Sequence, residues 1–165
     1  MAPYYYAGGR KIELELDREH AAVPLDEARR LGVSLPDDRR ELPGDLALVR
    51  QDELSPPERA SLERAGAMRQ VYNYRGTLMV PLPEVRVELE GDQRVAVLSA
   101  IAHAKVKADI DESTPGRLLV RLESNLGDDA LALANTITER ANPALSSARM
   151  VQVTARPDVR TRPKR

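Results

Sequence analysis

The sequence has no cysteine, phenylalanine or tryptophan among its 165 residues. Without cysteine the chain cannot form disulfides, zinc sites built from thiolates or a cysteine nucleophile. The core must then be built from Leu, Val, Ile and Ala with some of the five Tyr residues. Aliphatic cores without large rings bury less apolar area per residue, so we expect modest stability.

The sequence also lacks the patterns typical of catalysis and metal binding. His20 and His103 have no partner at metal-ligand spacing, and neither is accompanied by a nucleophile or an orienting acid. The acidic run at residues 109–112 lacks the spaced oxygen ligands and the glycine of a cation-binding loop. GxSxG, Walker and dinucleotide-binding motifs are missing as well. We therefore expect no enzymatic activity, no metal site and no cofactor.

The charge of the chain is nearly balanced, with a formal value of −1 and 31% charged residues. Such a balance favours neither a nucleic acid nor an anionic membrane as partner. No apolar run approaches the ~20 residues of a membrane span, and the N-terminus does not resemble a signal peptide. We expect a cytoplasmic protein, or a secreted or periplasmic one if a signal lies outside this sequence.

The C-terminal half has the clearest strand and helix periods. Residues 84–90 alternate apolar and charged side chains, as a strand does when one face is buried. After Gly91, Asp92 is a suitable N-cap and the spacing becomes helical, which predicts a helix over residues 92–105. The expected buried stripe of this helix consists of Val95, Leu98, Ile101, Ala102 and Val106.

Three more strands and a second helix complete this half. Residues 106–110 and 117–122, separated by a turn cluster, predict a hairpin. Asp128 and Asp129 begin a helix that Asn142-Pro143 ends, and residues 149–155 form the last strand. The expected stripe of this second helix consists of Leu131, Ala134, Ile137 and Thr138. The order of elements is that of a ferredoxin-like sandwich, whose two helices lie on one face of a four-stranded antiparallel sheet. The other face is left bare, so we expect binding there or at a sheet edge.

The N-terminal half repeats this order more weakly. Alternating Ile12, Leu14 and Leu16 predict a strand, and a helix over residues 25–32 follows it. The later elements are a charged loop at 36–44, a strand at 46–50, a helix from Ser55 to Gly66, and a strand, turn and strand over 68–80. The sequence therefore predicts an α+β fold of tandem ferredoxin-like (βαββαβ) sandwiches, the first one degenerate.

Pro81 and Pro83 frame the expected boundary between the two units. The predicted organisation is a degenerate α+β subdomain at residues 1–82, a ferredoxin-like domain at 83–156 and a flexible basic tail at 157–165.

Three tyrosines, Tyr4, Tyr5 and Tyr6, precede the turn signal Gly8-Gly9. They could form a stacking patch for a partner, or at least one ring could staple the terminus onto the domain while the others are half exposed. Tyrosine is at home at half-buried positions, and no further aromatic residues reinforce a stacking surface. The second interpretation is therefore favoured.

The segment from Tyr4 to Ile12, the charged strand after it, the tandem units and the helical segment from Asp129 to Arg140 together resemble the N-terminal prodomain of fervidolysin-like subtilases. The resemblance covers nearly the whole chain. It implies that residues 83–156 are a propeptide-type domain, which helps a subtilisin-like serine protease to fold and then inhibits it, in cis or in trans. Independently of the resemblance, the balanced charge and the lack of aromatic residues in strands 84–90 and 117–122 predict no nucleic acid and no membrane as partner.

The resemblance also implies a binding surface. Such prodomains lay the bare sheet face against two surface helices of the protease and run their C-terminal tail through the substrate cleft. On this sequence, the implied docking residues are Arg86, Glu88, Arg117, Leu119, Arg121, Gln152 and Thr154. Asp111 and Glu112 would cap helix N-termini of the partner. Lys164 and Arg165 would enter the cleft with the tail, and Arg165 in a specificity pocket implies a protease that prefers basic residues.

A non-catalytic adaptor or oligomerisation module that binds another protein is the alternative. The C-terminal tail distinguishes the two, because removal of residues 156–165 should weaken an inhibitor and leave an adaptor unaffected.

Overall fold

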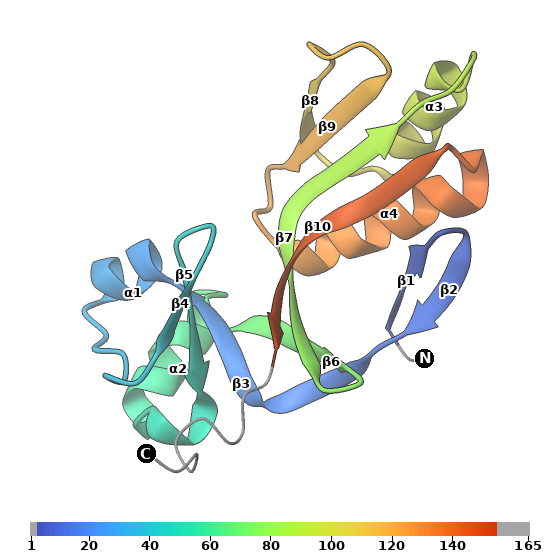
Figure 1. Ribbon diagram of the computed structural model, residues 1–165. Coiled ribbons are helices and arrows are strands. Elements are labelled where there is room, and N and C mark those ends of the chain that lie inside the picture. Colours follow the sequence, from blue (N-terminus) through green and yellow to red (C-terminus); the bar gives the residue numbers. More distant parts are fainter. Residues whose placement is uncertain (1–2, 155–165) are drawn as a thin grey trace.

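The computed structural model describes residues 3–154 as an α+β protein with a large antiparallel sheet and four α-helices (Figure 1). The strands are β1 (Tyr4–Ala7), β2 (Arg10–Glu13), β3 (Glu15–Pro24), β4 (Arg40–Leu42), β5 (Leu46–Arg50), β6 (Arg69–Tyr74), β7 (Thr77–Glu88), β8 (Ala108–Asp111), β9 (Arg117–Leu122) and β10 (Leu145–Thr154). The helices are α1 (Leu25–Leu31), α2 (Pro56–Arg64), α3 (Arg94–Ala104) and α4 (Gly127–Ala141), with a short 3-10 helix η1 (Gln51–Glu53).

The main sheet has eight strands, and β1 and β2 form a separate hairpin. Its hydrogen-bonded order is β4-β5-β3-β6-β7-β9-β8, and β10 pairs with β7. Within it, β3 to β6 of the N-terminal half lie in the order β4-β5-β3-β6, and the strands of the C-terminal half lie in the order β10-β7-β9-β8. Figure 1 shows α1 and α2 gathered around the first set of strands, and α3 and α4 around the second.

Strand β7 belongs to both halves. One of its edges pairs with β6 through residues 77–79 and then with β9 through residues 84–88, while its other edge pairs with β10. Pro81 and Pro83 lie where the partner changes from β6 to β9, and there the register with β10 also shifts, between Ala148 and Met150. A proline has no N–H for the ladder, so it is tolerated in a strand where pairing is interrupted. The expected boundary at residues 82 and 83 therefore lies inside a continuous strand.

Three apolar cores hold the elements together. The first lies between the N-terminal strands and α1 and α2, and includes Val23, Val49 and Leu62. The second lies on the opposite face of those strands, where Leu48 and Val71 meet β7 and β10. The third lies between the C-terminal strands and α3 and α4. The N-terminal part of the sheet is therefore covered on both faces.

Local sequence signals explain most helix ends. Ser55 and Glu58 form a reciprocal capping box at the start of α2, which satisfies two free backbone N–H groups. Helix α1 is followed by Gly32, whose φ of 72° lies in the left-handed region that glycine adopts most readily. Helix α4 has Asp128 and Asp129 in its first turn, where the helix dipole favours acids.

Helix α3 differs from its prediction in both its cap and its buried stripe. It begins at Arg94 with Gln93 as N-cap, so the expected cap Asp92 is wrong. Val95, expected in the core, is 73% exposed, and Ala102 is exposed as well. The buried residues of α3 are Val97, Ala100 and Ile101. In a helix composed almost entirely of apolar residues, several stripes have helical spacing, and tertiary packing selects one of them.

Three other segments also differ from the prediction. The single strand expected across Ile12 and Leu16 is divided between β2, which pairs with β1 around Gly8-Gly9, and β3. The charged loop at 36–44 contains the short strand β4, and β10 begins at Leu145 rather than at Arg149. In each case strand pairing with a distant segment determines the boundary, and local sequence does not report such pairing.

The expected tail at residues 157–165 lies outside the described residues. Between residues 3 and 154, no helix is both long enough and apolar enough to cross a membrane.

Candidate protein-binding surface

The C-terminal part of the sheet has one face without a covering helix. Val85, Val87, Leu118 and Val120 are buried on the side of α3 and α4, so alternate residues of the same strands lie on the opposite side. We call this second side the open face, defined by Glu84, Arg86 and Glu88 of β7, Arg117, Leu119 and Arg121 of β9, and Leu145, Ser147 and Arg149 of β10. The ladder places Arg86 opposite Leu119 and Glu88 opposite Arg117.

Four arginines surround two glutamates on the open face. The Glu88 carboxylate accepts from Arg86 at 2.5 Å, and the Arg117 guanidinium lies 3.6 Å from the same oxygen. The Glu84 carboxylate forms two ion pairs, with the guanidinium of Arg121 at 3.2 Å and with that of Arg149 at 3.3 Å. On the same side of the sheet, the ladder places Asp109 of β8 opposite Arg121 and Asp111 opposite Leu119, so four carboxylates balance the four arginines. Because exposed ion pairs contribute only about 0–1 kcal/mol, these charges do little for stability and can be used for recognition.

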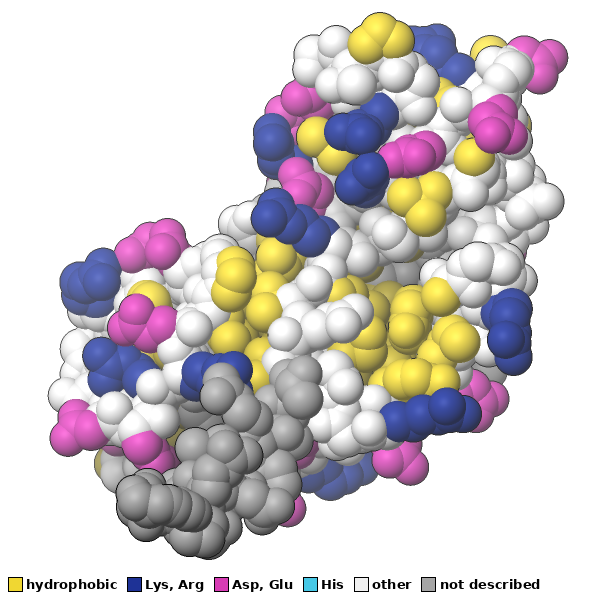
Figure 2. Space-filling view, in the orientation of Figure 1, with side chains coloured by type: hydrophobic (Ala, Val, Ile, Leu, Met, Phe, Trp, Pro, Cys, Tyr) yellow, Lys and Arg dark blue, Asp and Glu magenta, His cyan; other side chains and the backbone are white. Residues whose placement is uncertain are grey.

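A hollow of about 730 Å³ adjoins the open face and continues past β10 to the β1–β2 hairpin. On the hairpin side it is lined by Tyr5, Tyr6 and Met79. Figure 2 shows charged side chains of both signs over the upper part of the molecule and hydrophobic side chains on either side of the lower part of β10. The open face is therefore a charged surface that adjoins an apolar one.

The structure brings together five of the predicted docking residues. Arg86, Glu88, Arg117, Leu119 and Arg121 all lie on the open face and share its ion-pair network or its hollow.

The other predicted docking residues lie elsewhere. Gln152 pairs with Met79, which belongs to the core on the side of α3 and α4, although Gln152 also lines the hollow beside the edge strand β10. Thr154 pairs with Thr77 at the far end of β10. Lys164 and Arg165 lie outside the described residues.

Asp111 and Glu112 are both engaged within the chain. The Asp111 carboxylate accepts from the backbone N–H of Ser113 at 2.8 Å, and the Glu112 carboxylate accepts from Arg94 at 2.7 and 3.0 Å. The hydrogen bonds from Ser113 lower the pKa of Asp111, and the hydrogen bond from Arg94 lowers the pKa of Glu112. Both carboxylates are thus held in place by the chain's own groups, and each keeps further acceptor capacity.

Sequence reasoning missed four residues of the open face, namely Glu84, Leu145, Ser147 and Arg149. Glu84 has the same strand parity as Arg86 and Glu88, which is a signal that could have found it. Leu145 and Ser147 precede the predicted start of the last strand, so no strand period applied to them.

The N-terminal hairpin is fastened to α4 by its tyrosines. The hydroxyls of Tyr4 and Tyr6 donate to the same Glu139 oxygen at 2.7 and 2.8 Å, and the Asn135 side chain donates to the Tyr4 carbonyl at 2.8 Å. The hydrogen bond to Glu139 raises the pKa of Tyr4 to about 12, and the same contacts lower the pKa of Glu139. These contacts agree with the interpretation that tyrosine staples the terminus onto the domain.

The expectation that neither histidine has an acid beside it is wrong for His20. The His20 Nδ1 lies 2.9 Å from the Asp17 carboxylate on β3, and His103 is exposed on α3. The described residues contain no group of three or more His, Asp or Glu side chains that could hold a metal ion.

No protein-family model, curated protein or solved structure matches the chain. The function is therefore inferred from the surface itself.

Proposed function

We propose that the chain is a non-catalytic, protein-binding module of the protease-prodomain kind. In this proposal it docks on a subtilisin-like serine protease through the open face, assists the folding of that protease and inhibits it. The observation that supports docking is the open face itself. Within residues 3–154, helices or a second layer of strands cover the other faces of the main sheet, while this face presents mostly charged residues around Leu119.

We also propose that the two halves are tandem ferredoxin-like sandwiches. The support is the strand order, because β10-β7-β9-β8 places the first and third strands of that half side by side at the centre. The order β4-β5-β3-β6 gives the same arrangement when read from β6. In both halves every neighbouring pair is antiparallel, as the ferredoxin-like arrangement requires.

The charge of the open face indicates what kind of surface a partner should present. The arginines lie on β7, β9 and β10, and Asp109 and Asp111 lie beside them on β8, so a partner with complementary charges would associate faster and with greater specificity. Arg86 and Arg121 already pair with Glu88 and Glu84, so a partner carboxylate would join an existing network rather than meet bare cations. We therefore expect the docking surface of the partner protease to carry acidic groups opposite the arginines.

Inhibition of purified subtilisin-like proteases tests this proposal. We expect the full chain to inhibit peptide hydrolysis at sub-micromolar concentration, which corresponds to more than ~8 kcal/mol of binding free energy. The double variant Arg117→Glu/Arg121→Glu should weaken inhibition about tenfold or more, because it reverses two charges of the docking surface. The matched control Arg29→Glu/Arg64→Glu reverses two exposed arginines on α1 and α2 and should inhibit like the natural chain.

A chain shortened to residues 1–155 tests the role of the tail. Loss of inhibition with retained binding would support insertion of the tail in the cleft. An absence of inhibition by the full chain across the protease panel would refute the protease proposal.

An adaptor that binds a non-protease protein is the second candidate. It is favoured by the engagement of Asp111 and Glu112 within the chain, because a prodomain would use these carboxylates to cap helices of the protease. A partner recovered by affinity capture that loses binding in Arg117→Glu/Arg121→Glu, and keeps it when the tail is removed, would establish this candidate.

A further inference from the structure

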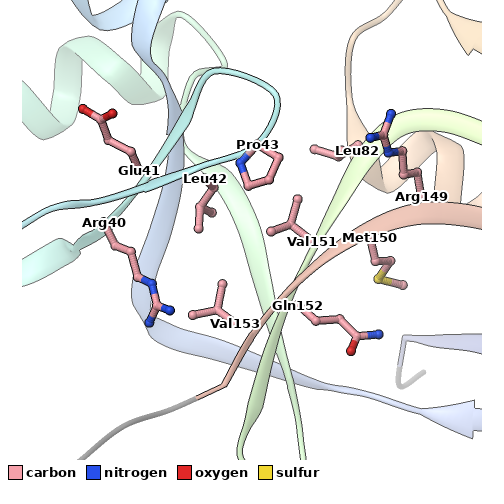
Figure 3. Close-up of a pocket in the computed structure, with 10 residues that line it drawn as sticks. All are labelled: Arg40, Glu41, Leu42, Pro43, Leu82, Arg149, Met150, Val151, Gln152 and Val153. Carbon is pink, nitrogen blue, oxygen red and sulfur yellow. The ribbon is translucent and has the colours of Figure 1, made fainter. Parts of the chain in front are cut away.

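Two unpaired sheet edges meet at a crevice away from the centre of the open face. Strand β4 pairs only with β5, and β10 pairs only with β7, so each has a second edge without a ladder partner within residues 3–154. The crevice between them has a volume of about 380 Å³, and Leu42, Pro43, Leu82 and Val151 line it (Figure 3). Free N–H and C=O groups along a sheet edge are a template for pairing with another chain.

The crevice lies over an apolar core, at the place where the two end strands around that core are not hydrogen-bonded to each other. Strands β4, β5, β3, β6, β7 and β10 are hydrogen-bonded in succession around the core that contains Leu42, Leu82 and Val153. The two end strands, β4 and β10, border the crevice from opposite sides. Val151 packs on this core and is only half-buried. An additional strand between β4 and β10 would cover apolar surface that the chain itself leaves partly exposed.

A positively charged arginine lies at each end of the crevice. Figure 3 shows Arg40 at the β4 end and Arg149 at the opposite end, while the carboxylate of Glu41 points away from the crevice. Arg149 is exposed and shares the carboxylate of Glu84, at 3.3 Å, with Arg121. Arg40 has no ion-pair partner within the part of the chain that the structure describes. An occupant with a carboxylate near each end would complement this arrangement.

We propose that the crevice binds an extended peptide segment of another protein, with apolar side chains at alternate positions and a carboxylate near each end. The segment adds to the free edge of β10, and its apolar side chains enter the crevice. This is strand addition, in which main-chain hydrogen bonds provide affinity and pockets for alternate side chains provide specificity. The site borders the open face, with which it shares Arg149, and the proposal holds whether or not the partner of that face is a protease.

The strand directions favour β10 over β4 as the edge that forms the backbone ladder. Five antiparallel steps separate β4 from β10, so these two edge strands run in opposite directions, and an inserted strand is antiparallel to only one of them. Antiparallel pairing is slightly more stable per residue, and β10 is the longer edge. Val151 and Val153 face the crevice while Met150 and Gln152 point away from it, which is the alternation that such a ladder needs (Figure 3).

Titration of the full chain with the synthetic peptide EVSLSVE, monitored by NMR and by amide hydrogen exchange, tests the proposal. We expect saturable binding below about 1 mM peptide and slower exchange of amides in residues 149–153. The variant Arg40→Glu/Arg149→Glu should weaken binding about tenfold, because both end pairs become repulsive. The matched control Arg29→Glu/Arg64→Glu, whose charges lie on α1 and α2 outside the crevice, should bind the peptide like the natural chain.

Two further controls distinguish strand addition at the crevice from non-specific binding of the peptide. The peptide EVVLSSE has the same composition without the alternation and should bind more weakly. Val151→Thr keeps the shape of the side chain, adds a hydroxyl to the crevice and should also weaken binding. Circular dichroism verifies that each variant is folded.

Several outcomes would overturn the proposal. They are an absence of binding at about 1 mM peptide, equal binding by Arg40→Glu/Arg149→Glu, and protection that falls outside β4 and β10. Concentration-dependent self-association that the same double variant abolishes would assign the crevice to a second copy of the chain instead, and would also overturn it.

Discussion

Strands β5 and β9 occupy corresponding places in the two halves of the sheet, but their side chains are buried differently. In β5 the four residues from Leu46 to Val49 are all buried, whereas in β9 burial alternates from Arg117 to Leu122. The reason is that β5 has α1 and α2 on one face and strands β7 and β10 on the other. Strand β9 has helices on one face only. A continuous apolar run therefore identifies a strand enclosed on both sides, and an alternating run identifies a strand with a free side.

This comparison separates stability from binding within one sheet. The second face of the N-terminal half is used for internal packing, so substitutions there should destabilise the fold. The second face of the C-terminal half is charged and open, so substitutions there should alter binding and leave the fold stable.

The largest expected effect is a truncation on the enclosed side. Leu48→Ala should lower the free energy of unfolding by about 2–5 kcal/mol, because Leu48 is 7% exposed in the core shared with β7 and β10. The same substitution on the open face, Leu119→Ala, should cost less than about 1 kcal/mol because Leu119 packs against no second layer. Urea unfolding of both variants measures the contrast, and equal losses would contradict the comparison.

A smaller loss is expected where α4 meets the strand shared by the two halves. A Cβ at Gly127 would lie 1.8 Å from the Pro81 carbonyl oxygen, so Gly127→Ala should destabilise the protein by about 1–3 kcal/mol or more. Helix propensity alone predicts a gain of about 0.5–1 kcal/mol for the same substitution. The sign of the change in urea midpoint therefore shows whether the close contact or the propensity dominates.

A pH-dependent effect is expected at Asp128, which joins the halves by accepting a hydrogen bond from Tyr72 at 2.8 Å. Burial raises the pKa of Asp128 above its usual value, although the bond from Tyr72 opposes this change. The folded chain thus holds the proton more tightly than the unfolded chain, and the resulting stability is present at low pH and lost as pH rises through the raised pKa.

Asp128→Asn keeps an acceptor for Tyr72 and removes the titration. The natural chain should therefore lose stability relative to Asp128→Asn as the pH rises from about 4 toward neutrality. Thermal unfolding of both proteins across this range measures the difference, and parallel curves would contradict the assignment.

The smallest effect is expected for a charge on the open face. Glu84→Gln removes the carboxylate that Arg121 and Arg149 share, yet should change the free energy of unfolding by less than about 1 kcal/mol. The same variant raises the positive charge of the open face and should strengthen binding to an acidic partner. A loss of stability comparable to that of Leu48→Ala would show that the open-face network is structural.

The sequence predicted elements best where a strong local period exists. Strand β9 was predicted to the residue from the run Arg117–Leu122, and α1 was predicted from its acids, arginines and terminal glycine. Alternation along β7 and β9 agrees with the face that the resemblance implied for Arg86, Glu88, Arg117, Leu119 and Arg121, although Glu84, which has the same parity, was missed. These predictions succeed because side-chain period and helix ends are properties of neighbouring residues.

The remainder depends on contacts between distant segments. Strand β4 is held by its pairing with β5, and β7 continues through two prolines because its partners change at that point. The choice of Val97 over Val95 for the core of α3 is made by packing against α4 and the sheet. The crevice between β4 and β10 has no local signal, because its two edges are about 100 residues apart in the chain.

The continuity of β7 also affects how the protein unfolds. Opening of either half would detach one end of this strand and take hydrogen-bond partners from the other half, so the two halves are expected to melt in a single cooperative transition. A substitution that strengthens one half would then slow proteolysis of the other. The shared strand makes resistance to unfolding a property of the whole molecule, because neither half opens without the other.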